Sequence, residues 1–174
     1  MDASTPDLYR RKIATLTAFA LTGCSTAPRP SVPLTLTIDV TTSPKINPDN
    51  RGRPSPIVLR LYELKTAATF DSADFFSLND KDSVTLGVDL LRREELVVQP
   101  GQSRSIELKV SNEGKLIAVV AAFRDLEKAV WRSKVALPPP VESGRFFGAR
   151  SISRRLTVVV DERTVSIQQS TSSQ

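Results

Sequence analysis

Hydrophobic and polar residues alternate along several segments of the chain. The clearest case is residues 34–40, where apolar Leu34, Leu36, Ile38 and Val40 are separated by polar Thr35, Thr37 and Asp39. A period of two places the apolar side chains on one face, which predicts a half-buried β-strand. The same alternation recurs in residues 57–62, 106–110, 131–135 and 156–160, and a last short strand is predicted at Val165 and Ile167.

Two segments depart from this alternation. Residues 116–123 are almost entirely apolar, which predicts a central strand that is covered on both faces. In residues 65–91 the apolar positions are spaced more as in a helix, so we expect one or two short helices there, the first capped by Ser72. The aromatic residues of this stretch are expected to pack onto the sheets as ordinary core, in preference to lining a ligand pocket.

Turn residues separate the predicted strands. Pro100-Gly101 fits the central pair of a type II turn, residues 112–114 (Asn-Glu-Gly) predict a hairpin, and residues 161–163 separate the last two strands. Together these elements predict an all-β fold, a two-sheet antiparallel β-sandwich of about eight strands with one or two short inserted helices. We expect the sandwich to occupy residues 34–169 and to be followed by a polar C-terminal tail at residues 170–174.

The N-terminal region has a different character. A basic stretch at residues 9–12 precedes the uncharged, mainly apolar residues 13–21, which are too few to span a bilayer. This order predicts a signal peptide over residues 1–23. It ends in a motif that resembles the lipobox of bacterial lipoprotein precursors and consists of Leu21, Thr22, Gly23 and Cys24.

Cys24 is the only cysteine of the chain, so it cannot form an internal disulfide. If the motif is a lipobox, the Cys24 thiol is acylated and carries a covalent lipid, which is the only attached group we expect. Residues 24–33, which contain three prolines, would then form a lipidated tether. The alternative is an incidental cysteine that follows an apolar helix.

The composition argues against most catalytic chemistry. The chain has no histidine, which removes the usual general base and the commonest zinc ligand, so triad hydrolases and zinc enzymes are disfavoured. An enzyme would need paired carboxylates as in glycosidases, and those available are Asp74, Asp80, Asp82, Asp89, Glu94 and Glu95. Nothing marks two of them as acid and nucleophile, so no catalytic or metal-binding residue is expected.

The formal net charge of the chain is +5, and its basic residues are scattered along the predicted strands. Nucleic-acid-binding proteins gather such residues into one dense run or stripe, so nucleic acid is not an expected partner. A solvated basic surface instead favours an acidic partner.

Several segments, taken in order, resemble one family. They are Asn47 to Asp49, Arg51 to Pro56, Val58 to Leu64, Phe70, Ala73 to Phe75, Leu86 to Leu90, Pro100-Gly101, Ala121 to Leu126 and Trp131-Arg132. Following a lipobox, this ordered set is similar to the TssJ outer-membrane lipoproteins of type VI secretion systems. The resemblance covers most of the chain from about Leu34 to Val160.

This resemblance implies a transthyretin-like sandwich without enzymatic activity, which fixes a secretion envelope complex to the outer membrane. The implied partner is the periplasmic C-terminal region of the inner-membrane protein TssM. Ser25 follows the cysteine, and a residue other than Asp at that position implies sorting to the outer membrane. In the family the loop between the first two strands is a principal contact, which here implies a partner-binding loop made of Lys45, Ile46, Asn47, Pro48, Asp49, Asn50, Arg51, Gly52 and Arg53.

The residues of this loop are compatible with binding. The connection is longer than a hairpin needs, and its prolines restrict the backbone and so lower the entropy lost on docking. The same features also fit a solvated loop without a partner.

A second hypothesis is a periplasm-facing lipoprotein that binds a small ligand or glycan through an aromatic patch. The candidate pairs are Phe75 with Phe76 and Phe146 with Phe147, whose rings would have to be accessible to solvent. The tether hypothesis expects no small-molecule substrate, and it expects Phe146 and Phe147 to pack onto the sandwich.

Overall fold

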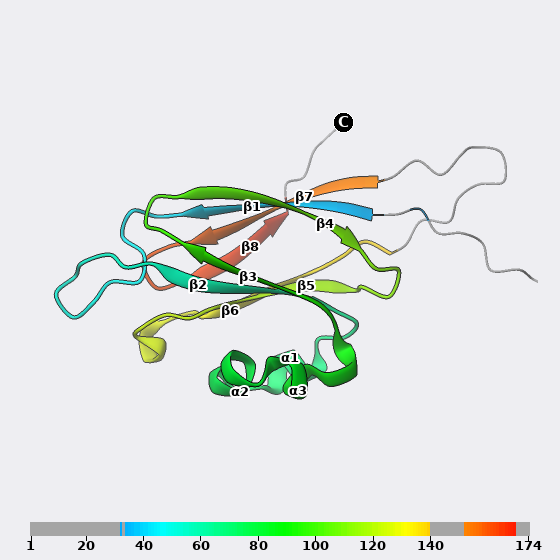
Figure 1. Ribbon diagram of the computed structural model, residues 1–174, viewed down its shortest axis with the longest axis horizontal. Helices are drawn as coiled ribbons and strands as arrows, with labels where there is room; N and C mark the ends of the chain where they lie inside the picture. Colours follow the sequence, from blue (N-terminus) through cyan, green and yellow to red (C-terminus); the bar gives the residue numbers. More distant parts are fainter. Residues whose placement is uncertain (1–31, 33, 140–151, 170–174) are drawn as a thin grey trace, which may run out of the picture.

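In the computed structural model the described residues are 32, 34–139 and 152–169. They form two four-stranded sheets that pack face to face, with a layer of short helices against the outer face of one sheet (Figure 1). The first sheet has the order β4-β1-β7-β8, with β1 (Leu34–Thr42), β4 (Ser103–Val110), β7 (Ile152–Val160) and β8 (Val165–Gln169). The second has the order β3-β2-β5-β6, with β2 (Ile57–Leu64), β3 (Leu90–Val98), β5 (Leu116–Ala121) and β6 (Arg132–Ala136).

The predicted sandwich of about eight strands is confirmed, with one difference in strand direction. The neighbouring strands β1 and β7 run parallel, from the pair Leu34 and Ile152 to the pair Thr42 and Val160. The other named strand pairs are antiparallel. The chain enters β7 after a connection from the opposite sheet, and such a crossover allows the parallel direction.

The core between the sheets follows from the alternation in sequence. Leu36, Ile38 and Val40 of β1 are each at most 1% exposed, and they meet Leu59 and Leu61 of β2 in one cluster. Removing one such side chain from water contributes about 1.5–3 kcal/mol. Hydrophobic burial on this face therefore holds the two sheets together.

The helical layer creates a second core on the outer face of β2 and β5. It consists of α1 (Ala68–Ser72), α2 (Phe75–Asp80), α3 (Asp82–Leu86) and the 3₁₀ turn η1 (Gly87–Asp89). Phe70, Leu78 and Leu86 of this layer are buried against Tyr62 and Val120. The prediction that β5 is central and covered on both faces is confirmed, since all six of its residues are buried.

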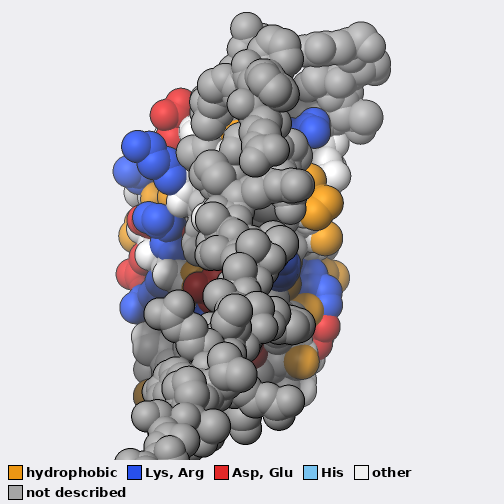
Figure 2. Space-filling view, turned by 90° about the vertical axis from the view of Figure 1, so that its right-hand side faces the viewer, with side chains coloured by type: hydrophobic (Ala, Val, Ile, Leu, Met, Phe, Trp, Pro, Cys, Tyr) orange, Lys and Arg blue, Asp and Glu red, His pale blue; other side chains and the backbone are white. Residues whose placement is uncertain are grey.

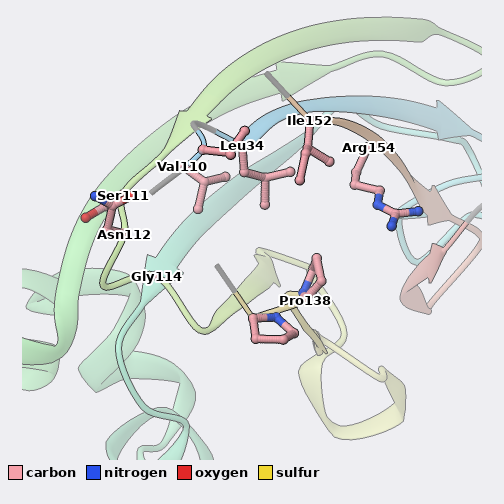
Figure 3. Close-up of a pocket in the computed structure, with 10 residues that line it drawn as sticks. Leu34, Val110, Ser111, Asn112, Gly114, Pro138, Ile152 and Arg154 are labelled. Atoms are coloured by element: carbon pink, nitrogen blue, oxygen red, sulfur yellow. The ribbon is translucent and has the colours of Figure 1, made fainter. Parts of the chain in front are cut away.

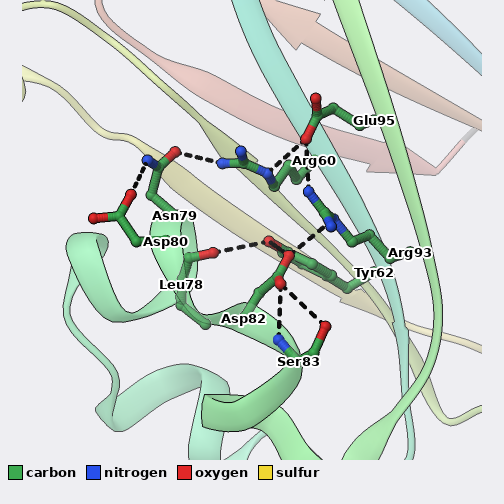
Figure 4. A network of polar contacts seen from close by, with 9 residues as sticks. All are labelled: Arg60, Tyr62, Leu78, Asn79, Asp80, Asp82, Ser83, Arg93 and Glu95. Atoms are coloured by element: carbon green, nitrogen blue, oxygen red, sulfur yellow. Dashed lines mark hydrogen bonds and ion pairs between the residues drawn. The ribbon is translucent and has the colours of Figure 1, made fainter.

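Polar contacts join the same helices to β2 and β3 (Figure 4). The Tyr62 hydroxyl lies 3.1 Å from a carboxylate oxygen of Asp82 and 3.2 Å from the Leu78 carbonyl oxygen. Arg93 of β3 pairs with the same carboxylate at 2.9 Å. Burial of the hydroxyl, together with the negative charge of Asp82, raises the pKa of Tyr62 well above its ordinary value. Arg60 and Tyr62 stand on the face of β2 opposite the apolar Leu59 and Leu61, and the helices cover them.

The helical stretch is divided differently from the prediction. It contains three short α-helices, and its last two predicted residues, Leu90 and Leu91, begin the strand β3. The periodicity missed this strand because β3 is an edge strand whose middle carries charged residues, and only Leu96 and Val98 are buried. Assigning residues 90–91 to a helix was therefore wrong.

The predicted helix cap was also wrong. Ser72 is the last residue of α1, and its hydroxyl donates a hydrogen bond to the Thr69 carbonyl at 3.2 Å. The capping residue of the next helix is Asp74, whose carboxylate accepts the N–H of Ser77 at 3.0 Å. A cap needs an extended backbone before the first turn, and the end of a helix does not provide it.

Two of the three predicted turns are confirmed. Gly101 has a φ of 73°, as the third position of a type II turn requires, and residues 161–164 close the β7–β8 hairpin. The turn at residues 112–114 exists, but it joins β4 to β5, which lie in different sheets, so the predicted hairpin is wrong. No helix among residues 34–139 and 152–169 is long and apolar enough to cross a membrane.

Candidate partner-binding surface

The loop between β1 and β2, residues 43–56, lies at one end of the sandwich, and its tip projects beyond the strands (Figure 1). The start of the loop is fixed to the first sheet, because the Ser43 N–H donates to the Val160 carbonyl at 2.9 Å. Ile46 is fully buried in the core, and its carbonyl accepts the Ser55 N–H at 3.1 Å. The two ends of the loop are therefore held together.

Asn47 ties the base of the loop to two other segments. It is buried and has a left-handed backbone with a φ of 48°. Its side-chain amide donates to the Pro56 carbonyl at 2.8 Å, and its side-chain oxygen accepts the N–H of Arg124 at 2.8 Å. Its own N–H donates to the Glu162 carbonyl at 3.0 Å. Asparagine suits this position because it tolerates the left-handed conformation and can both donate and accept.

The tip of the loop is organised by Asp49. Its carboxylate accepts the N–H groups of Arg51 at 2.8 Å and Arg53 at 3.0 Å, and also the Arg53 guanidinium at 2.8 Å. These bonds, first of all the one from the Arg53 N–H, lower the pKa of Asp49 from 3.8 to about 2. The carboxylate is therefore ionised at neutral pH and gives the tip a defined shape.

These contacts divide the nine residues predicted to bind a partner. Ile46 and Asn47 are turned into the molecule and hold the loop in place. The other seven residues are exposed or half-buried: Lys45, Pro48, Asp49, Asn50, Arg51, Gly52 and Arg53. A partner that docks on this conformation can contact these seven residues directly. It depends on Ile46 and Asn47 only because they hold the loop in place.

A polar groove separates the loop tip from its neighbours. It is lined by residues 48–53, by Arg124, Asp125 and Lys128 in and before the 3₁₀ turn η2 (Leu126–Lys128), and by Arg163 in the β7–β8 turn. We refer to it below as the loop-end groove. The sequence did not predict that residues 124–128 and Arg163 belong to this surface. The only signal was that residues 121–126 carried part of the family resemblance.

The aromatic patch of the alternative hypothesis is only partly exposed. Phe75 is half-buried and packs edge-on against Trp131 with ring centroids 5.3 Å apart, while Phe76 beside it is 65% exposed. The expectation of ordinary core is confirmed for Phe70, which is 1% exposed. Phe146 and Phe147 lie outside the described residues.

An apolar depression lies at the opposite end of the sandwich, where β1 begins (Figure 3). Its lining includes Leu34, Val110, Pro138 and Ile152. Figure 2 views the molecule from this end, and Lys and Arg side chains stand out on both flanks of the described part. The two ends therefore differ in chemistry, since the loop-end groove is polar.

The remaining predicted site residues are placed as follows. Leu21, Thr22, Gly23 and Cys24 lie outside the described residues. The six carboxylates considered for catalysis are engaged in a helix cap, hydrogen bonds and ion pairs: Asp74, Asp80, Asp82, Asp89, Glu94 and Glu95. Within residues 34–139 and 152–169, no three His, Cys, Asp or Glu side chains are grouped so as to hold a metal ion.

Comparison with protein families matches residues 34–163 to the family described as "Type VI secretion lipoprotein, VasD, EvfM, TssJ". A comparison with curated proteins gives no match. Among solved structures, the T6SS lipoprotein TssJ1 from Pseudomonas aeruginosa is 32% identical with a TM-score of 0.70, covering 81% of this chain and 99% of that chain.

Two further solved structures share the fold. Serratia marcescens Lip, a membrane bound component of the type VI secretion system, is 21% identical with a TM-score of 0.67, covering 78% of this chain and 97% of its own. A chain in a structure of the T6SS protein TssM C-terminal domain from EAEC is 25% identical with a TM-score of 0.60, covering 78% of this chain and 98% of its own.

Proposed function

Because this chain belongs to the type VI secretion lipoprotein family, we propose that it anchors the secretion envelope complex to the outer membrane. A lipid on Cys24 holds the chain in the membrane, and the loop at residues 45–53 binds the periplasmic C-terminal region of TssM. The family is one of secretion lipoproteins, and we propose that the chain has no catalytic role and takes no small-molecule substrate.

The observation that carries the binding half of the proposal is the position of the loop. Leu34 and the loop stand at opposite ends of β1, a strand of nine residues that spans about 30 Å. A domain tethered through the residues before Leu34 therefore presents residues 45–53 away from the membrane. The likeness to a chain in a structure of a TssM C-terminal domain supports TssM as the partner.

The rigidity of the loop also supports a binding role. Ile46 and Asn47 fix its base, and the bonds to Asp49 order its tip before any partner arrives. A preordered loop loses little conformational entropy on docking, which favours affinity.

The anchor is tested by membrane fractionation of cells that express Cys24→Ser. This variant loses the acylated thiol, so we expect the protein to leave the outer-membrane fraction, while a Thr26→Ala control stays with it. Retention of the Cys24→Ser protein in the outer membrane would show that lipid is not the anchor.

The loop is tested by the affinity of the detergent-solubilised full chain for the TssM C-terminal region. Residues 48–53 are replaced by a Gly/Ser sequence of equal length, while Ile46 and Asn47 are kept because they belong to the folded core. We expect binding to fall at least tenfold. The control replaces exposed Asn112 and Glu113 at the other end of the sandwich and should bind normally. Unchanged affinity after the loop replacement would contradict the proposal.

A further inference from the structure

We propose that the loop-end groove binds an acidic segment of the protein partner, whose carboxylates pair with Arg51, Arg124 and Arg163. The inference rests on the proposed function, since it concerns the same end of the sandwich. It goes further in two respects: it names the chemistry of the bound segment, and it adds η2 and the β7–β8 turn to the contact surface.

The first argument is the charge of the groove. Its lining contains five cationic side chains, Arg51, Arg53, Arg124, Lys128 and Arg163, against two carboxylates, Asp49 and Asp125. A groove with this excess of positive charge attracts anions, because the low-dielectric walls strengthen the field within it.

The second argument is that both carboxylates of the groove are already engaged. Asp49 pairs with Arg53 at 2.7 Å. One carboxylate oxygen of Asp125 is shared between Lys128 at 3.2 Å and Arg163 at 3.8 Å. Asp49 also stays ionised, because its backbone and guanidinium bonds hold its pKa at about 2. Neither Asp49 nor Asp125 therefore neutralises Arg51 or Arg124.

The third argument concerns the arginines that remain. The guanidinium groups of Arg51 and Arg124 are exposed, and neither forms an ion pair or side-chain hydrogen bond with any residue in the described ranges. Arg163 is already paired at one end, since an Nη–H of its guanidinium donates to Glu162. Its buried Nε–H, however, has no hydrogen-bond acceptor among those residues, because 3.8 Å to Asp125 is too long for one. A buried donor without an acceptor is costly, and a carboxylate entering the groove would satisfy it.

The position of the groove favours a protein over a membrane surface as the source of the carboxylates. The groove lies at the loop end of the sandwich, whereas the chain leaves the described fold toward its N-terminus at Leu34, at the other end of β1. A membrane that holds the N-terminal tether therefore lies on the far side of the domain from Arg51 and Arg124.

The experiment measures the fluorescence anisotropy of a labelled oligoglutamate peptide against the full chain in nonionic detergent. We expect saturable binding that weakens steeply when ionic strength rises from about 0.01 M to about 1 M, because the Debye length falls from about 30 Å to about 3 Å. The double variant Arg51→Glu and Arg124→Glu should bind at least tenfold more weakly at low salt.

The matched control is Arg104→Glu with Lys109→Glu, two exposed residues of β4 whose reversal changes the net charge by the same amount. It should keep most of the affinity. Equal losses in the two double variants would show only a response to net charge and would overturn the groove assignment. Competition for the peptide by phosphatidylglycerol, added as mixed micelles with the same detergent, would instead assign the groove to a membrane surface and overturn the proposal if this competition is lost in the Arg51 and Arg124 variant.

The same variants are then measured against the TssM C-terminal region, which separates the two proposals. If the double variant Arg51→Glu and Arg124→Glu binds the TssM C-terminal region more weakly than the wild type, and its binding no longer depends on salt, the result supports an acidic segment in TssM. Wild-type binding that neither salt nor these substitutions change overturns the groove inference and leaves the loop proposal standing. Absence of TssM binding by a wild-type chain that still binds oligoglutamate overturns the proposed partner and supports the groove.

Discussion

The side-chain oxygen of Asn47 accepts the backbone N–H of Arg124 at 2.8 Å, and this bond joins residues that are 77 positions apart. It connects the base of the β1–β2 loop to the segment that forms the other wall of the loop-end groove. The shape of the groove therefore depends on a buried residue that does not line it.

Replacing Asn47 with Ala should destabilise the fold. The substitution leaves the Arg124 N–H and the Pro56 carbonyl without their partner and places Ala in a left-handed backbone, which together cost about 2–4 kcal/mol. The free energy of unfolding from urea denaturation measures this cost. Asn50→Ala, at an exposed position of the same loop, should change it by less than about 0.5 kcal/mol.

Asn47→Gly separates the two causes, since glycine accepts the left-handed backbone but forms neither side-chain bond. We expect it to be less destabilising than Asn47→Ala. A loss of stability in Asn47→Ala no larger than that of Asn50→Ala would show that the observed bonds carry no stability.

Acid should disorder the loop tip only at very low pH. The pKa of Asp49 in the folded chain is about 2 and lies below its ordinary value of 3.8. The order that it provides is therefore fully present above about pH 4 and is lost as the pH falls through about 2. The chemical shift of the Arg53 Nε–H, followed by NMR, should titrate with that midpoint. The transition should disappear in Asp49→Asn, and a midpoint near 4 would contradict the observed bonding.

Replacing Arg132 with Lys should loosen the helical layer. One guanidinium nitrogen of Arg132 donates to the carbonyls of Phe70 and Ala73 at 2.9 Å, and the other donates to that of Asp71 at 3.0 Å. A single ammonium cannot reproduce this planar arrangement, so we expect a loss of about 1–3 kcal/mol.

The measurement is hydrogen exchange in α1 together with fluorescence of Trp131, the only tryptophan, which lies next to Arg132 and packs on Phe75. Lys134→Ala is the control, because its ion pair with Asp71 is exposed and contributes about 1 kcal/mol or less. If Arg132→Lys protects α1 as well as the wild type does, the three carbonyl bonds do not hold the layer.

Replacing Gly114 with Ala should destabilise the connection between the sheets. A Cβ at this position would lie 2.5 Å from an oxygen of Glu63, whose carboxylate is buried and accepts the Ser111 N–H at 2.6 Å. We expect a loss of about 1–3 kcal/mol in thermal or urea unfolding.

The comparison variant is Gly52→Ala, where the added Cβ has open space and the cost of about 1 kcal/mol comes from the left-handed backbone alone. If Gly114→Ala proved less destabilising than Gly52→Ala, the expected clash would be absent, and the Glu63 side chain would have to move away from the added Cβ.

Several features of the fold could be predicted from local sequence. The alternation at Leu36, Ile38 and Val40 correctly predicted the buried face of β1, because neighbouring side chains of a strand point to opposite faces. The family was predicted from an ordered set of short segments and is confirmed by the match over residues 34–163. For the edge strand β3 the pattern failed, since four charged residues occupy its middle and only Leu96 and Val98 are buried.

Other features could not be predicted from local sequence. The alternation in residues 57–62 puts Tyr62 on the strand face opposite Leu59 and Leu61, yet Tyr62 is fully buried because three helices pack over it. The hairpin at residues 112–114 failed for a related reason, since a turn sequence does not specify whether the strands it joins pair with each other or lie in different sheets.

By itself, the sequence determined the apolar face of the regularly alternating strands such as β1, the presence of a short helical insertion and the family, because these depend on residue spacing and order along the chain. Only the tertiary structure decided that Ile46 and Asn47 belong to the core and that Arg51, Arg124 and Arg163 line one groove. The physical reason is distance in sequence. Burial and charge pairing are set by strand pairing between segments as far apart as β1 and β7, and local periodicity carries no information about such pairs.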